Sequence, residues 1–137
     1  MKTMISVALG MLALCVLGGA ITWSGPGCNG MVCSAGPIPT ISSGFGTSPS
    51  VTAGGVTTAF RLNVGTGGTA STGVIAMPTA PTGWNCYFAD VTTPASFVTY
   101  MTASTTATVS VTNYSRTTGL AIVWTASDIL ACTCFPF

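Results

Sequence analysis

The segment TTAFRLNVGTGG, Thr57 to Gly68, decides the fold class of this chain. Its apolar residues Phe60, Leu62 and Val64 stand at alternate positions with polar residues between them. This period-two alternation is typical of a β-strand with one buried and one solvated face, and the glycines that follow end the strand. We therefore predict a half-buried strand here and a fold built from strands.

Similar short runs follow towards the C-terminus, with Gly, Pro, Ser or Asp between them at spacings of about 8 to 15 residues. No convincing amphipathic helix pattern occurs after residue 24. Short strands separated by turn residues predict an all-β domain, an antiparallel β-sandwich or jelly-roll-like fold of about seven strands. The further runs are 72–78, 83–92, 96–105, 106–115, 119–125 and 129–137.

Towards the N-terminus the composition changes twice. Residues 1–23 are mostly apolar and carry one charge, Lys2, which predicts a secretory signal peptide. The alternative is a retained hydrophobic anchor helix, because the uncharged run 4–21 is long enough to cross a hydrocarbon core of about 30 Å. Residues 24–50 are dense in Gly, Pro and Ser and predict a connector, so the β-sandwich domain is placed at 51–137.

Charged residues are scarce in this chain, and their scarcity limits the classes of function that the chain can have. Charged residues make up 4% of it, the net charge is +1, and it has no histidine and no glutamate. This excludes the basic footprint that nucleic-acid binding needs. The only acids, Asp90 and Asp128, each stand at a strand end, where aspartate commonly caps a turn. We predict a non-enzymatic protein with no catalytic residue and no cofactor.

The cysteines predict disulfides rather than catalysis or metal binding. Cys86 has no histidine partner to activate it as a nucleophile. The spacings C-x4-C and C-x-C do not suit a zinc site, so no metal is predicted. One or two disulfides are expected, with buried thiols as the alternative. Cys28 and Cys33 could clip the connector, while Cys132 and Cys134 point to one face of a strand, where either could reach Cys86.

Four residues are the predicted surface contacts of the domain. Trp84 and Trp124 fall within strand patterns and are expected in the core, although exposed indoles could instead stack on sugars. Tyr114 and Arg116 lie close together in the chain, and Arg116 could stack on an aromatic ring or pair with one of the two acids.

Several motifs between residue 47 and the C-terminus carry a family resemblance. The most specific are FRLNVGTGGTAS, TGWNC, DVTTP and TNYSRTTGLAIVWTASD. With them the chain resembles a β-rich domain found at the C-terminal end of tail-fibre and other virion-surface proteins of tailed bacteriophages. The resemblance implies a structural, oligomeric building block of a virus particle, and no catalytic residues are associated with that family.

The resemblance also implies partners and a location. The expected partners are other copies of the chain, for example in a trimer, other virion proteins and a host-surface glycan. The expected location is the virion surface, with a membrane-anchored protein as the alternative, contacting the membrane only through residues 4–21. From a different class, the alternative function is a secreted or membrane-anchored carbohydrate-binding or adhesin module.

Overall fold

A computed structural model of the chain describes residues 36–52 and 55–137, and this part of the protein contains strands and no helix. The prediction of an all-β antiparallel fold is confirmed, with eight strands where about seven were expected. The predicted signal or anchor segment 1–23, and Cys28 and Cys33, lie outside the described residues. The strands are β1 (Thr40–Ser43), β2 (Ser50–Val51), β3 (Ala59–Asn63), β4 (Thr72–Ala76), β5 (Trp84–Asp90), β6 (Phe97–Ser104), β7 (Thr108–Ser115) and β8 (Ile129–Pro136).

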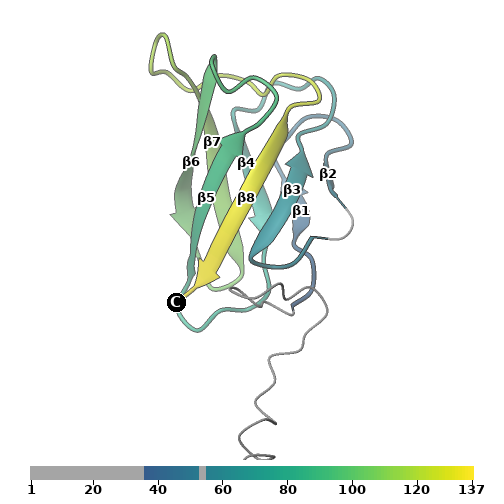
Figure 1. Cartoon of the computed structure of the whole chain (residues 1–137), viewed down its shortest axis with the longest axis vertical. Coiled ribbons are helices and arrows are strands. Elements are labelled where there is room, and N and C mark those ends of the chain that lie inside the picture. Colours follow the sequence, from purple (N-terminus) through teal and green to yellow (C-terminus); the bar gives the residue numbers. More distant parts are fainter. Residues whose placement is uncertain (1–35, 53–54) are drawn as a thin grey trace, which may run out of the picture. The chain divides into compact units, whose positions relative to one another are not determined.

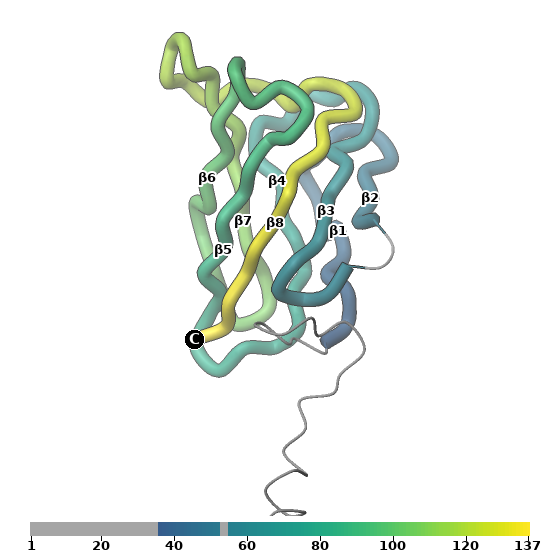
Figure 2. The backbone as a smooth tube through the Cα atoms, in the orientation of Figure 1, coloured from purple at the N-terminus to yellow at the C-terminus, as the bar shows by residue number. Residues whose placement is uncertain are grey.

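The strands form two antiparallel sheets of four strands each, ordered β1-β4-β7-β6 and β2-β3-β8-β5. In Figure 1 the sheet that carries β5, β8 and β3 lies in front of the sheet that carries β6, β7 and β4. Strands β5 and β6 belong to different sheets but are consecutive along the chain, and the tube in Figure 2 shows the chain passing between them at the top. The arrangement is a β-sandwich-like fold.

One hydrophobic core lies between the two sheets, because alternate residues of the inner strands point inward. In the segment that predicts the fold class, Phe60, Leu62 and Val64 are all buried, which confirms the expected alternation. In β5 the buried positions include Trp84 and Cys86, again as predicted. The remaining buried members of the core are Phe45, Ile75, Met77, Ala80, Val109, Val111, Trp124, Leu130, Cys132 and Cys134.

The N-terminal edge of the domain differs from the sequence expectation. Strand β1 lies inside the range 24–50, where the composition indicates a connector, and β2 begins at Ser50. Both are edge strands, so each pairs with one neighbour only. Edge strands are often short and polar, since one side remains in contact with water. The apolar alternation that identifies an inner strand is therefore missing from them.

The segment 119–125, expected to be a strand, is not one. The tight turn after β7 brings the chain back beside the end of that strand, where Ser115 N donates to Leu120 O and Ile122 N donates to Asn113 O. Further pairing is blocked because β4 and β6 already occupy both sides of β7. The segment then turns inward to bury Trp124. Its apolar residues Leu120, Ile122 and Val123 consequently remain exposed.

A glycine in β4 allows two aromatic rings to pack at one end of the core. Phe45 and Trp124 lie with their ring centroids 5.2 Å apart. A Cβ atom on Gly73 would come within 2.1 Å of the Phe45 ring, so any larger residue there must displace the ring.

Within the described ranges no helix has the length and apolar character that crossing a bilayer requires.

Candidate functional site

The predicted disulfide forms between Cys86 and Cys134. These residues lie directly opposite each other on β5 and β8, with Cα atoms 4.1 Å apart. The register explains why Cys132 is left out, since that residue faces Phe88 of β5 and Phe60 of β3. The sequence alone allowed Cys86 to pair with either Cys132 or Cys134, because the register between β5 and β8 cannot be derived from it.

The free thiol of Cys132 has no catalytic character. Its side chain is buried, and desolvation raises the pKa of the Cys132 thiol to about 12. A thiol that stays protonated at neutral pH is a poor nucleophile. Among the residues that the structure describes, no group of three or more His, Cys, Asp or Glu side chains is arranged to hold a metal ion.

The two acids of the chain come together at the end of the core. Asp90 Oδ1 accepts hydrogen bonds from the backbone amides of Thr92 at 2.8 Å and Thr93 at 2.9 Å, which confirms the predicted turn-capping role. The Thr93 hydroxyl also lies 3.0 Å from Asp90 Oδ2 and 3.2 Å from Asp128 Oδ1. Asp128 therefore joins the β5–β6 connection to the start of β8.

Burial governs the chemistry of this pair. Asp128 is 1% exposed, and its Oδ2 atom has no hydrogen-bond partner. Desolvation, with a smaller effect from the nearby charge of Asp90, raises the pKa of Asp128. Asp90 is also buried, at 7% exposed. The arrangement joins two loops through hydrogen bonds to Thr92 and Thr93.

Both tryptophans named as surface contacts lie in the core. Trp84 is 3% exposed and donates its indole N–H to Pro78 O at 3.0 Å. Trp124 is 5% exposed, and its indole nitrogen has no partner. Neither ring can serve as a stacking platform for a sugar, and the expectation that they fill the core holds.

The other two predicted contact residues, Tyr114 and Arg116, line a surface hollow of about 520 Å³ together with Tyr100. Tyr100 of β6 and Tyr114 of β7 have ring centroids 5.8 Å apart and planes inclined by 53°. Tyr100 is 57% exposed, so one ring of the pair is open to solvent. Val98, Ser115 and Gly119 complete the lining.

Arg116 is held at the rim of this hollow by main-chain oxygens. Its Nε donates to Pro94 O at 2.8 Å and to Phe97 O at 2.9 Å. The partners are a carbonyl group of the β5–β6 connection and one at the start of β6, in place of the acid that the sequence allowed for. Within residues 36–52 and 55–137, the terminal nitrogens of the guanidinium group form no hydrogen bond.

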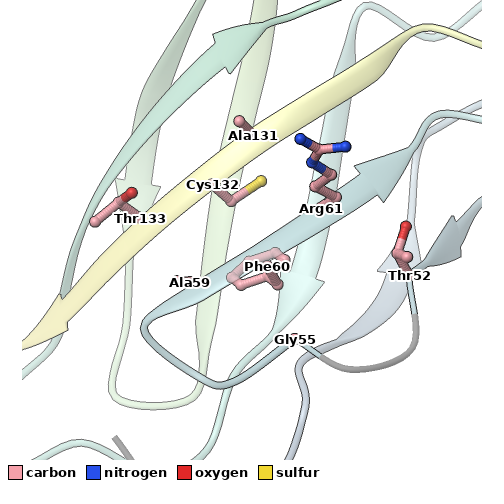
Figure 3. Close-up of a pocket in the computed structure, with 8 residues that line it drawn as sticks. All are labelled: Thr52, Gly55, Ala59, Phe60, Arg61, Ala131, Cys132 and Thr133. Carbon is pink, nitrogen blue, oxygen red and sulfur yellow. The ribbon is translucent and has the colours of Figure 1, made fainter. Parts of the chain in front are cut away.

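A second hollow, of about 420 Å³, lies over β3 and β8 and contains the other described cation, Arg61 (Figure 3). The outward-facing neighbours Ala59, Ala131 and Thr133 are small, so they offer a ligand few contacts. It has no aromatic side chain open to solvent, because the Phe60 ring is buried. We therefore take the Tyr100–Tyr114–Arg116 hollow as the candidate site.

Two parts of these sites were missed by sequence reasoning. Tyr100 was placed in a strand but not beside Tyr114, because the β6–β7 register was needed to bring them together. Thr93 was not identified, because its hydroxyl links the two acids through a contact between segments that are distant in the sequence.

Comparison with family models, curated proteins and solved structures finds no match to this chain.

Proposed function

We propose that this chain is a non-enzymatic structural protein of a bacteriophage particle, a fibre, decoration or other surface component. It would act through self-association and surface contact. The resemblance of its motifs to virion-surface domains of tailed phages motivates the proposal. Its β-rich architecture is compatible with that class, in which strands form compact and durable building blocks.

The observation that carries the proposal is a surface with almost no charge. Both acids are buried, so in the described domain only Arg61 and Arg116 place a charged side chain at the surface. Large apolar side chains are meanwhile exposed, among them Tyr87 of β5 and Phe135 of β8. Copies of such a domain do not repel one another, and near-zero net charge favours association. Exposed apolar groups in turn favour contact with a partner surface.

For the finer fold class we propose a plain antiparallel sandwich rather than a jelly roll. Consecutive strands β2 and β3, and β6 and β7, pair directly within their sheets. This pairing favours hairpin-like connections within each sheet.

Native mass spectrometry of the full-length chain tests self-association. The proposal predicts a discrete oligomer that persists when ammonium acetate is raised from about 0.1 M to about 0.5 M. This change shortens the electrostatic screening length from about 10 Å to about 4 Å, and apolar contacts are insensitive to it. A purely monomeric chain at all concentrations would contradict it. Tyr87→Ser is expected to weaken the oligomer, and Arg61→Gln serves as the matched surface control.

A second function is favoured by one specific observation. The Tyr100–Tyr114–Arg116 hollow provides an open aromatic surface beside a fixed cation. A carbohydrate-binding or adhesin module would use such a hollow, with tyrosine in place of the tryptophans that the sequence suggested. This role is compatible with display on a particle, where a glycan of the host surface would be the partner.

A further inference from the structure

We propose that the Tyr100–Tyr114–Arg116 hollow binds an acidic sugar residue, such as a uronic acid within a surface polysaccharide. The proposal rests on the second function given above and specifies its site and its ligand. Its basis is a combination of three chemical features: an open aromatic face and a fixed guanidinium group in the hollow, and hydroxyl groups beside it on the same sheet face.

The aromatic face is provided by the tilted pair of tyrosines. The two rings lie on the outer face of the β1-β4-β7-β6 sheet, and the more exposed one, Tyr100, is directly paired with Thr112 of β7. Sugar rings have apolar C–H faces that pack on aromatic rings, whose bodies are apolar and whose phenol groups can still bond to water or ligand. A volume of about 520 Å³ falls in the range of small-ligand sites.

The guanidinium group selects the charge of the ligand. Two carbonyl groups hold Arg116 through Nε alone, so its terminal nitrogens can form a paired contact with a carboxylate. No carboxylate of the domain competes for them, because Asp90 and Asp128 are buried and bonded to threonine groups. An anionic group on the ligand would be the natural partner for Arg116.

Hydroxyl groups continue from the tyrosines across the same sheet face. The Thr112 hydroxyl lies 2.7 Å from that of Thr72 and 3.1 Å from that of Thr102. Hydroxyl side chains both donate and accept, which suits the hydroxyl groups of a saccharide. This row lies outside the hollow; Thr112 at its centre is buried, and Thr72 and Thr102 on either side are exposed. A saccharide longer than one unit would reach these exposed hydroxyl groups, so the site fits one unit of a longer chain better than an isolated small anion.

The test is an NMR titration of the full-length ¹⁵N-labelled chain with oligogalacturonate, its methyl ester and inorganic phosphate. We expect saturable shifts from oligogalacturonate at the amides around Tyr100, Tyr114 and Arg116. The neutral ester and phosphate should bind at least about tenfold more weakly, the factor expected for loss of one charged hydrogen-bonded contact or of the stacked ring.

Variants assign the binding to the hollow. Tyr100→Ala should reduce affinity about five- to tenfold, and Arg116→Lys should reduce it by a smaller factor than Arg116→Gln, since lysine keeps the charge but not the planar fork. Arg61→Gln, in the hollow over the other sheet, should bind like the unaltered chain. Thermal unfolding followed by circular dichroism checks that each variant is folded, which matters most for Arg116 because it fixes a connection.

Three outcomes would overturn the proposal. Equal affinity for the acid and its ester would remove the role of charge, and phosphate binding as tight as oligogalacturonate would indicate a bare anion site. Saturable shifts located elsewhere would reject this hollow while leaving carbohydrate binding in place. Absence of saturable shifts with oligogalacturonate would reject the site and its ligand together, but not the structural role, which oligomer and particle measurements test separately.

Discussion

Asp90 and Asp128 share one hydrogen-bond donor, the Thr93 hydroxyl, which lies 3.0 Å from a carboxylate oxygen of the first and 3.2 Å from one of the second. A hydroxyl has a single proton, so it can serve only one carboxylate at a time. The other oxygen of Asp128 is buried without a partner. A proton on Asp128 would relieve both the buried charge and the repulsion between the acids.

This pair gives the domain a pH dependence of stability with a definite sign. The pKa of Asp128 is raised above its ordinary value of 3.8, first by desolvation and then by Asp90. The folded state therefore binds the proton more tightly than the unfolded chain. This contribution to stability is fully present below pH 3.8 and is lost as the pH rises through the raised pKa.

Asp128→Asn should remove that dependence. In urea unfolding across acidic to neutral pH, the unfolding free energy of the unaltered chain relative to the variant should fall as the pH rises and then become flat. Asp90→Asn, which removes the neighbouring charge, should move the fall to lower pH. A relative stability that rises with pH would contradict the account.

The Cys86–Cys134 bridge should contribute substantially to stability. It joins residues separated by 48 positions, and the chain-entropy relation for a loop of this length gives about 4 kcal/mol. Replacing both cysteines with alanine should lower the unfolding free energy by a comparable amount in guanidinium titrations. Cys132→Ala keeps the bridge and should cost less, about 1 to 2 kcal/mol from lost packing. Equal losses in the two variants would argue against the bridge.

Alkylation distinguishes the cysteines directly. Because its thiol is buried and its pKa is about 12, Cys132 should resist iodoacetamide in the folded chain and react only in denaturant. Peptide mapping of the modified chain gives the readout. Rapid modification of Cys132 under native conditions would show that the core is more open than described.

The two buried tryptophans form a matched pair for testing hydrogen bonding. Trp84→Phe removes the bond to Pro78 O, whereas Trp124→Phe removes an indole N–H that has no partner. We expect the first substitution to be the more destabilising by about 1 to 3 kcal/mol, the typical cost of leaving a buried polar group unpaired. Chemical unfolding of both variants measures the difference. The reverse order would mean that the Trp124 nitrogen has a partner after all.

Gly73→Ala should disturb the aromatic packing at one end of the core. The added methyl group would occupy the position of the Phe45 ring, which packs against Trp124. Overpacking of this kind typically costs about 1 to 3 kcal/mol. Thermal unfolding should show the loss, and Gly119→Ala in the exposed turn should be milder because nothing lies near its added atom, although its positive φ still carries some strain.

The alternation of apolar and polar residues predicted the inner strands, but it did not predict which strands pair with each other. The alternation around Leu62 and Cys86 depends on burial of one face, which sequence shows directly. Edge strand β1 has no such signal. The apolar run 120–123 resembles a strand, although β4 and β6 already occupy both sides of the neighbouring strand β7. Likewise, the pairing of Cys86 with Cys134 and of Tyr100 with Tyr114 depends on register, which sequence spacing alone does not fix.

The central claim is that this chain is a surface component of a phage particle. Density-gradient sedimentation of particles from cells that carry the gene, followed by intact mass measurement of each fraction, tests it most directly. The account predicts that the chain sediments with intact particles, that external protease removes it from them, and that its mass shows the Cys86–Cys134 bridge. Recovery only as free protein in the supernatant, or only with membranes, would contradict it.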